Sequence, residues 1–462
     1  MLSYNQALDF IHGLNVFGTK LGLHNITELL ELLGNPHEGI KIIHVAGTNG
    51  KGSTCAMIDS ILRSAGFKVG LYTSPYLEVF NERMRVNGEN ISDEDLARLT
   101  DKVRETVIYM RENKLGSPTE FEVVTAIGFL YFKEQAVDFL VLEVGMGGRL
   151  DATNVVIPVI SVITPISLDH QQYLGDTLTD IAREKCGIIK PGIPVVTGPQ
   201  EPEAMKVIEK ISNSKGCSLT KVINKETDIP PHKISYQPVT DDEHGMIFDL
   251  KTPQNSFTDL EIGLIGKHQL DNAATAVGAI EALRFIGIDI KKNAIYSGLK
   301  KVKWPGRLEI LGEKPMVLID GAHNIAGIKS LKRTLMQYFS KKKKILVIGI
   351  LEDKDYKEIL KAIVPVADII ICTAPENPRA LSAAKLSNII SDFFGDIVLR
   401  ADSKDANIAK KSYSDMSIKM YTEENIENAV KIAQSLAASE DIIIFAGSLY
   451  MIGHVRTLLK KL

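Results

Sequence analysis

Residues 44–53 have the residue types and the spacing that could bind a phosphate group. They read HVAGTNGKGS and follow two apolar residues, Ile42 and Ile43. An apolar strand, a glycine-rich turn and the start of a helix together place backbone N–H groups and the positive end of the helix around an anion. The three glycines allow positive φ angles, and Lys51 adds a mobile positive charge. The stretch therefore predicts a binding site for a nucleoside triphosphate.

This loop departs from the general pattern G-x-x-x-x-G-K-[S/T] at two positions. Val45 occupies the place of the first glycine, and Gly52 separates Lys51 from Ser53. The alternative interpretation is a glycine turn that joins a strand to a helix and contains a lysine by chance. The context of strand, loop and helix favours the phosphate site.

Two further apolar stretches end in residues that could hold a metal ion. Residues 139–142 lead into Glu143 and a glycine-rich loop, and residues 159–163 lead into a polar loop that contains His170. In nucleotide-hydrolysing sheets, a carboxylate at the carboxyl end of a strand holds or bridges magnesium. A solvent-facing glutamate and a structural histidine are the alternatives. The position of both residues at strand ends favours a functional role.

The elements that must position these residues follow from a repeated pattern. Apolar, β-rich runs alternate with helical patterns, which is typical of a mostly parallel sheet covered by helices. The first strands are expected at residues 42–45, 69–72, 139–142, 159–163 and 195–196. Residues 221–261 predict a small β-rich insertion, and residues 268–286 predict a helix.

A second set of alternating elements follows the turn at residues 303–306. Its strands are expected at residues 316–319, 345–348, 367–372 and 442–445. The residues of the turn make it the best candidate for a linker between domains. We therefore predict an α/β fold of two domains. Residues 1–303 would form an N-terminal ATPase domain with the phosphate loop and the mostly parallel sheet, and residues 304–462 a smaller, Rossmann-like α/β domain.

Composition excludes several classes of protein. The 462 residues are 45% hydrophobic and 24% charged, with a formal net charge of −3. This balance is typical of a soluble globular protein and argues against a nucleic-acid-binding surface. The one basic cluster, residues 341–344, is expected to be solvated. No apolar run approaches the length of a membrane span, and the N-terminus lacks a signal peptide, so we expect a cytoplasmic protein with reduced cysteines.

Taken together, the motifs resemble the folate branch of the Mur ligase family, which comprises the folylpolyglutamate synthases and dihydrofolate synthases. The matching segments follow the family order along nearly the whole chain, at residues 47–53, 73–75, 81–83, 121–122, 143–154, 168–170, 183–185, 266–269, 272, 304–307, 320–324, 353–355 and 447–450. The resemblance implies an ATP-dependent ligase. Such an enzyme activates a carboxylate as an acyl phosphate, which the amine of L-glutamate then attacks.

For the N-terminal domain, the resemblance implies roles for individual residues. The triphosphate would be bound by Asn49, Gly50, Lys51, Gly52 and Ser53. Glu143 and His170 would hold two Mg²⁺ ions. Because Gly52 removes the hydroxyl that elsewhere follows the lysine, Ser74 is the candidate for the missing metal ligand, with Ser53 second. Lys185, whose charge alone would indicate a solvated helix face, would carry a carbamate.

For the C-terminal domain, the resemblance assigns Arg307 to the phosphates and Asp320 to the ribose, joined by Asn272 from the first domain. A planar guanidinium suits the charge spread over a transferring phosphoryl group. The predicted catalytic residues are Lys51, Lys185, His170 and Arg307. His323 and Ser448 are candidates for binding the incoming glutamate. A helix cap is the alternative explanation of residues 320–324.

The nearest competing interpretation is a cell-wall Mur ligase that adds an amino acid to a UDP-linked peptide. Gly52, the loop of Ser74 and the absence of room for a UDP domain in residues 1–41 argue against it. A nucleotide-driven switch would carry N-K-x-D, but residues 224–228 place the aspartate one position too late. The expected partners are small molecules, namely L-glutamate and dihydropteroate, reduced folates or both. We expect a monomer that binds neither nucleic acid nor membranes.

Overall fold

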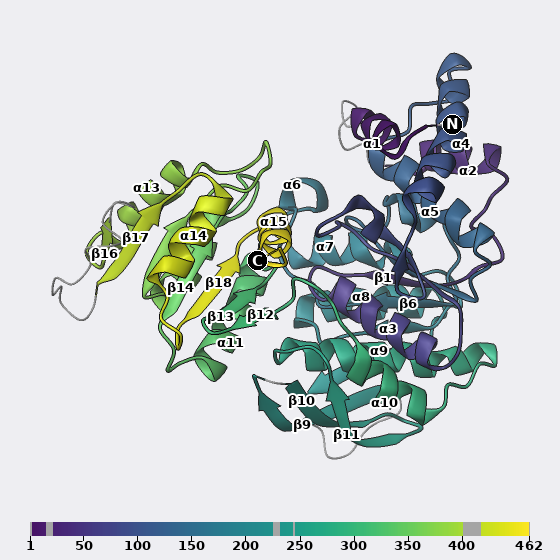
Figure 1. Ribbon diagram of the computed structural model, residues 1–462. Helices are drawn as coiled ribbons and strands as arrows, with labels where there is room; N and C mark the ends of the chain where they lie inside the picture. The colour runs from purple at the N-terminus through teal and green to yellow at the C-terminus, as the bar shows by residue number, and fades with distance from the viewer. Residues whose placement is uncertain (1, 15–21, 225–231, 244, 401–416, 462) are drawn as a thin grey trace. The chain divides into compact units, whose positions relative to one another are not determined.

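The computed structural model describes residues 2–14, 22–224, 232–243, 245–400 and 417–461. These residues form two compact units. The first unit is drawn from Met1–Thr240, Met246–Gly263 and His268–Lys303, and the second unit from Asp241–Gly245, Leu264–Lys267 and Trp304–Leu462. Each unit is built around a β-sheet (Figure 1). Residues 225–228, which carry most of the N-K-x-D comparison, lie outside the described residues.

The sheet of the first unit has eleven strands in the order β11-β10-β9-β8-β7-β6-β1-β5-β2-β3-β4. The central strand β1 is parallel to both of its neighbours, β5 and β6. The strands are β1 (Lys41–Ala46), β2 (Val69–Tyr72), β3 (Met84–Val86), β4 (Glu89–Asn90), β5 (Phe139–Glu143), β6 (Ile160–Ile163), β7 (Val195–Thr197), β8 (Leu219–Asn224), β9 (Lys233–Asp242), β10 (Gly245–Lys251) and β11 (Ser256–Ile262).

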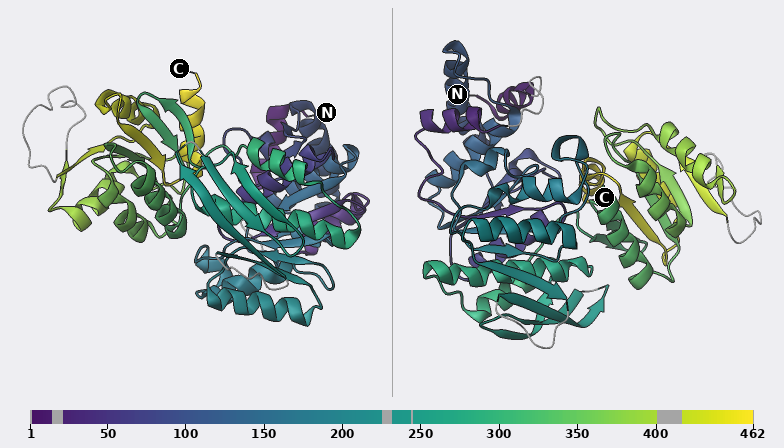
Figure 2. Two further views of the ribbon diagram at one scale, coloured as in Figure 1. Left: turned by 90° about the horizontal axis from the view of Figure 1, so that it is seen from below. Right: turned by 180° about the vertical axis from the view of Figure 1, so that it is seen from behind.

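Helices cover both faces of this sheet (Figure 2). Helices α1, α2, α4 and α5 share one hydrophobic core with β1, β2 and β5, whereas α3 packs against α9 and α10. The α-helices are α1 (Tyr4–Gly13), α2 (His24–Leu32), α3 (Lys51–Ser64), α4 (Asp93–Glu112), α5 (Glu120–Glu134), α6 (Gln171–Leu174), α7 (Leu178–Lys185), α8 (Pro202–Ser214), α9 (His268–Ala282) and α10 (Lys292–Lys301).

Local sequence explains where these elements begin and why they are buried. Residues 42–46 of β1 are all buried, with no alternation of buried and exposed side chains, as expected for a parallel strand with helices on both faces. Helix α5 begins with a capping box, in which the hydroxyl of Thr119 accepts from the N–H of Glu122 and Oε2 of Glu122 accepts from the N–H of Thr119.

The sheet of the second unit has seven strands in the order β12-β13-β18-β14-β15-β17-β16, with β12 antiparallel and the other pairs parallel. Its strands are β12 (Glu309–Glu313), β13 (Met316–Ile319), β14 (Lys344–Ile348), β15 (Ile369–Cys372), β16 (Val398–Arg400), β17 (Ile418–Thr422) and β18 (Ile442–Ala446). Its α-helices are α11 (Ile325–Tyr338), α12 (Tyr356–Ile363), α13 (Ala383–Phe394), α14 (Ile426–Leu436) and α15 (Leu449–Leu459).

The structure confirms the predicted fold class and corrects two details. The β-rich segment after residue 221 is not a separate insertion, because its strands continue the main sheet through the parallel pair β7–β8. Lys344 is not solvated. It is 6% exposed, and its Nζ donates to the carbonyl of Lys342 at 2.7 Å. Within the described ranges, no helix combines the length and the apolar character needed to cross a bilayer.

Candidate active site

The predicted phosphate loop joins β1 to α3 in a backbone conformation that favours glycine. Gly50 is the N-cap of α3 with φ 82°, and Gly47 has φ 150°. A Cβ atom would lie 1.9 Å from Oγ1 of Thr164 at Gly47 and 2.2 Å from Oδ1 of Asn272 at Gly50. The N–H of Thr54 donates to Gly50, so the N–H groups of residues 51–53 precede the hydrogen-bond ladder of the helix. This helix start can receive an anion.

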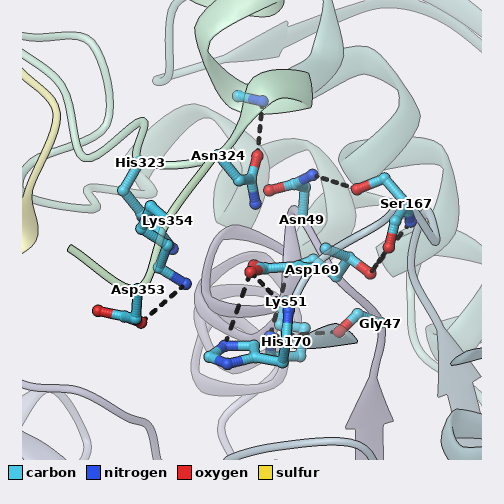
Figure 3. Close-up of polar contacts among 12 residues, drawn as sticks. Gly47, Asn49, Lys51, Ser167, Asp169, His170, His323, Asn324, Asp353 and Lys354 are labelled. Atoms are coloured by element: carbon cyan, nitrogen blue, oxygen red, sulfur yellow. Dashed lines mark hydrogen bonds and ion pairs between the residues drawn. The ribbon is translucent and has the colours of Figure 1, made fainter. Parts of the chain in front are cut away.

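The loop that follows β6 supports the phosphate loop directly. The N–H groups of Thr48 and Asn49 both donate to the carbonyl of Pro165, at 3.0 and 3.2 Å. The Thr48 hydroxyl donates to the carbonyl of Ser167, and Nδ2 of Asn49 donates to Oγ of Ser167 at 3.1 Å (Figure 3). Two N–H groups of the loop are therefore already used. Anion binding is left to the start of α3 and to Lys51.

Two lysine side chains converge on the carbonyl oxygen of Gly47. Nζ of Lys51 donates to the carbonyls of Gly47 and Thr48 at 3.3 Å each, and Nζ of Lys185 donates to Gly47 at 2.8 Å. Lys185 ends α7 and is buried. Burial, followed by the positive charge of Lys51, lowers the pKa of Lys185 to about 7. At neutral pH this residue is therefore partly a neutral amine.

Close backbone packing holds Lys185 beside the loop that follows Glu143. The N–H of Arg149 donates to the carbonyl of Glu184 at 2.7 Å. The buried side chain of Asn154 donates through Nδ2 to the carbonyls of Arg149 and Gly187, at 3.0 and 3.2 Å. Hydrogen bonds thus join the glycine loop to the segment of Lys185.

Glu143 and Ser74, two predicted metal ligands, lie together at the carboxyl edge of the sheet. Glu143 ends β5 and is 5% exposed. Its Oε2 accepts the backbone N–H of Ser74 at 3.1 Å. The contact uses the backbone of Ser74 rather than its hydroxyl.

His170 follows β6 in a left-handed conformation, with φ 51°, and precedes α6. Its N–H donates to Oδ1 of Asp169 at 2.9 Å, and its Nε2 lies 3.9 Å from the same oxygen (Figure 3). The imidazole is 37% exposed, so a ligand can reach it. Asp169 lies beside the imidazole, although no role for it was expected.

The donor set near the phosphate loop fits Mg²⁺ that binds together with a nucleotide. In the part of the chain that the structure describes, no three His, Cys, Asp or Glu side chains cluster as a metal site. A metal ion at Glu143 or His170 would therefore take further ligands from serine hydroxyls or phosphate oxygens. Mg²⁺ is usually bound in this way, through one or two carboxylates and substrate phosphates.

Asn272, predicted as a nucleotide residue, lies on α9 and is 2% exposed. Its Oδ1 faces Gly50, and its Nδ2 donates to Oε1 of Gln269 at 2.9 Å. Helix α9 thus brings Asn272 to the phosphate loop within the first unit, at a sequence separation of more than two hundred residues.

In the second unit, Asp320 holds the loop that carries Arg307. Its Oδ2 accepts the N–H of Leu308 and its Oδ1 accepts that of Ala322, both at 2.9 Å. The guanidinium of Arg307 packs over Gly321, where a Cβ atom would lie 2.0 Å from Nη1. Burial raises the pKa of Asp320, and the charge of Arg307 opposes that shift. Both carboxylate oxygens of the predicted ribose ligand therefore already accept backbone N–H groups.

The predicted glutamate residues also lie in the second unit. Nδ1 of His323 is 2.8 Å from the carbonyl of Gly321, so Nδ1 carries the proton of a neutral ring. Oδ1 of Asn324 accepts from the N–H of Gly327 and caps α11, which confirms the helix-cap alternative for this residue (Figure 3). Ser448 is the N-cap of α15 and is 2% exposed, and its hydroxyl has no hydrogen-bond partner among the described residues.

Sequence reasoning missed the supporting residues of the first unit. Ser167, Asp169 and Asn154 hold the phosphate loop, His170 and the segment of Lys185 respectively. Two of them lie inside segments that match the family, and Ser167 directly precedes one. Their position in the polar loops that follow β5 and β6 was a signal, but their hydrogen-bond partners depend on tertiary contacts.

Comparisons with known proteins define the class. Residues 45–280 match the Mur ligase middle domain, and residues 306–449 match the Mur ligase glutamate ligase domain. The chain therefore belongs to the Mur ligase family, whose members are ATP-dependent ligases.

The relatives place the chain within this family. It is 40% identical to the dihydrofolate synthase/folylpolyglutamate synthase of Bacillus subtilis, over 99% of each chain. It is 37% identical to the folylpolyglutamate synthase of Lacticaseibacillus casei, over 83% of this chain and 88% of that protein. The structure of Mycobacterium tuberculosis folylpolyglutamate synthase complexed with ADP has a TM-score of 0.86 and 31% identity, over 99% of each chain. The folate branch is thus confirmed over the cell-wall alternative.

Proposed function

We propose that this protein uses ATP to join L-glutamate to folates, extending tetrahydrofolate and converting dihydropteroate to dihydrofolate. The observation that carries the proposal is the meeting of Lys51 and Lys185 on the carbonyl of Gly47, in a chain whose relatives carry both enzyme names. Lys51 is suited to bind a phosphate group, and Lys185 has an amine that can be modified.

In the first step, a carboxylate oxygen of the folate attacks the γ-phosphorus of ATP, which yields an acyl phosphate and ADP. The start of α3 and Lys51 hold the phosphates, with Asn49, Gly50, Gly52 and Ser53 lining the loop. Arg307 stabilises the charge of the transferring group. Asn272 and Asp320 bind the nucleoside.

In the second step, the amine of glutamate attacks the acyl carbon. Phosphate leaves, and the nitrogen loses a proton as the amide forms. The buried hydroxyl of Ser448 is a hydrogen-bonding group for the incoming glutamate. Nε2 of His323 is an acceptor in the neutral ring and can orient the amine.

Mg²⁺ would supply positive charge that offsets the phosphates, and Glu143, His170 and the hydroxyl of Ser74 would hold it. The neutral amine of Lys185 would add CO₂ and release one proton to solvent, so that this buried side chain becomes a carbamate anion. Its pKa of about 7 and its place beside the phosphate loop support this modification.

The proposal also covers the domain boundary, the oligomeric state and the partners of the protein. A domain boundary between residues 303 and 304 would separate the phosphate loop from Arg307. We expect the protein to act as a cytoplasmic monomer on small molecules, without nucleic acid or membrane partners.

The decisive experiment measures phosphate release with ATP alone, with ATP and an acceptor, and with ATP, acceptor and glutamate. Dihydropteroate and tetrahydrofolate serve as acceptors, and mass spectrometry weighs the products. We expect sustained phosphate release only with all three substrates, together with a mass gain of one glutamate. Release without any glutamylated product would contradict the proposal.

A further inference from the structure

Arg307 lies in a turn with an unfavourable backbone conformation. The residues on both sides of it have positive φ angles, 72° at Gly306 and 45° at Leu308. Glycine adopts such an angle at little cost, but a residue with a bulky side chain is strained by it. The side chain of Leu308 is also buried, with 2% exposure. The turn therefore depends on contacts with the rest of the second unit.

Hydrogen bonds to both flanking residues hold this turn. The carbonyl of Gly306 accepts the N–H of Gly321 at 2.8 Å, and Oδ2 of Asp320 accepts the N–H of Leu308 at 2.9 Å. The N–H of Gly306 donates to Oε2 of Glu309 at 2.8 Å. Two carboxylates thus accept the N–H groups on either side of the arginine. Asp320 is a proposed nucleotide ligand, whereas Glu309 has no role in the reaction proposed for this protein.

Glu309 is itself held by an arginine of the last helix. Nε of Arg456 lies 3.0 and 2.9 Å from the two carboxylate oxygens, and its Nη2 lies 2.9 Å from Oε1. A guanidinium that donates to both oxygens fixes the orientation of a carboxylate as well as its position. The side chains of Arg456 and Glu309 are 12% and 21% exposed. Solvent therefore screens this pair less than an ion pair on the surface.

Helix α15, which carries Arg456, also reaches the turn with its first residue. Leu449 packs against Gly321, where a Cβ atom would lie 2.5 Å from Cδ2 of the leucine. The guanidinium of Arg307 packs against the same glycine. The N-cap of this helix is Ser448, the candidate for binding the incoming glutamate. One helix thus connects the proposed glutamate residue with the turn of the arginine.

We propose that Glu309 and Arg456 are positioning residues, which hold the turn of Arg307 so that its guanidinium is fixed for the transferring phosphoryl group. The inference rests on the proposed function. In this role neither residue contacts a substrate, because both act through Arg307. A displacement of about 1 Å at a reacting group can lower the rate about 100-fold. Loss of the pair should therefore lower turnover more than it weakens ATP binding.

The test measures glutamylated product for Arg456→Met and Arg456→Lys. Methionine removes the contacts with both oxygens of Glu309 but keeps an unbranched, apolar side chain. We expect kcat to fall about 10- to 100-fold, while the KM for ATP changes less than about 5-fold. Lysine keeps the charge but does not pair with both oxygens in the same plane, so Arg456→Lys should lose less activity than Arg456→Met.

A double variant shows whether the pair acts through Arg307. If it does, Arg456→Met should lower kcat less than about 3-fold in the background of Arg307→Ala, because the group that it positions is already absent. A merely structural role would give the same loss in both backgrounds. Arg400→Met is the matched control, because Arg400 donates to Asn388 and Ser391 of α13 in the same unit. It should behave like the wild type.

Hydrogen exchange tests the contact without any turnover. The N–H of Gly306 should exchange slowly in the wild type, and Arg456→Met should speed this exchange while that of α12 stays unchanged. Mass spectrometry of the peptide that contains Gly306 measures the effect. Thermal unfolding of each variant shows whether the unit still folds. If Arg456→Met does not fold, Arg456→Lys serves for the same comparisons.

Unchanged kcat in Arg456→Met, equal losses in the two backgrounds, or a loss confined to the KM for ATP would overturn the positioning role and leave the ligase intact. A wild type without product on any acceptor would instead overturn the proposed function. Exchange at Gly306 still tests the pair in that case, because equal rates in the wild type and in Arg456→Met would show that the pair does not hold the turn.

Discussion

At the scale of single residues, Lys51 and Lys185 share an oxygen atom but differ in surroundings. Lys51 is the first residue of α3 and is partly exposed, whereas Lys185 is buried at the end of α7. Two ammonium groups on one carbonyl repel each other, and the repulsion grows where water is excluded. The buried amine gives up its proton more readily, which supports the proposed roles of Lys51 as the phosphate-binding cation and Lys185 as the modified amine.

Lys51→Ala should therefore abolish ligation. The loop would keep its backbone but lose the mobile charge that follows the phosphates through the transfer. We expect kcat to fall by about 100-fold or more, measured as glutamylated product per enzyme. Lys206→Ala, on the exposed face of α8, is the control and should behave like the wild type. Retention of most activity by Lys51→Ala would overturn the role of the loop.

The carbamate on Lys185 should depend on pH in a direction fixed by its lowered pKa. Only the neutral amine adds CO₂, and its fraction rises through about pH 7 rather than near the usual 10.5. At constant CO₂ pressure, carbamate content and activity should rise together across this range. The carbonyl signal of ¹³CO₂-labelled enzyme reports the modification. Lys185→Ala should be inactive and partly restored by acetate, and a label-free, fully active wild type would contradict the idea.

Removal of Glu143 or His170 should change the metal dependence of the enzyme. Glu143→Ala and His170→Ala each remove one proposed ligand of Mg²⁺. We therefore expect about 10- to 100-fold weaker activation by Mg²⁺, or loss of turnover. Titration of Mg²⁺ at saturating ATP measures the effect. Unchanged activation curves for both variants would show that the ion is held elsewhere.

At the scale of elements, the sequence predicts where the strands lie better than it predicts which strands pair with one another. The run at residues 69–72 coincides with β2, because four buried residues between turn signals leave little choice. The predicted β-rich segment at residues 221–261 coincides with β8–β11, but the pairing between β7 and β8 joins it to the main sheet. Long-range contacts such as that of Asn272 with Gly50, or the two N–H groups that Asp320 accepts, leave no periodic trace in the chain.

Helix α3 offers a test of how the loop is built, because left-handed glycines lie at both of its ends. Gly50 has φ 82° and no room for a Cβ, whereas Gly66 has φ 93° and nothing within 4 Å. Alanine at either position should cost about 1–2 kcal/mol of stability through backbone strain. Only Gly50→Ala should also displace Asn272 and weaken ATP binding.

Thermal unfolding and nucleotide titration of both variants separate strain from steric conflict. Equal loss of ATP affinity in Gly50→Ala and Gly66→Ala would show that the contact with Asn272 has no part in nucleotide binding.

At the scale of the whole molecule, the proposed reaction needs residues from both units. The first unit carries the phosphate loop, Lys185 and the proposed metal ligands, and the second carries Arg307, Asp320, His323 and Ser448. Each unit holds its own loop in place through hydrogen bonds within that unit. Asp320 fixes the loop of Arg307, as the loop after β6 fixes the phosphate loop. An isolated first unit should therefore bind nucleotide but form no product.

Arg307→Ala tests this division within the full chain. If the guanidinium acts on the transferring phosphoryl group, its interaction is stronger in the transition state than with bound ATP. We expect kcat to fall about 10³-fold while the KM for ATP changes less than about 5-fold, as for other arginines that stabilise phosphoryl transfer. Arg333→Ala, on α11 of the same unit, is the matched control. A loss confined to ATP affinity, with kcat unchanged, would mean that Arg307 contributes to ATP binding and not to the transfer of the phosphoryl group.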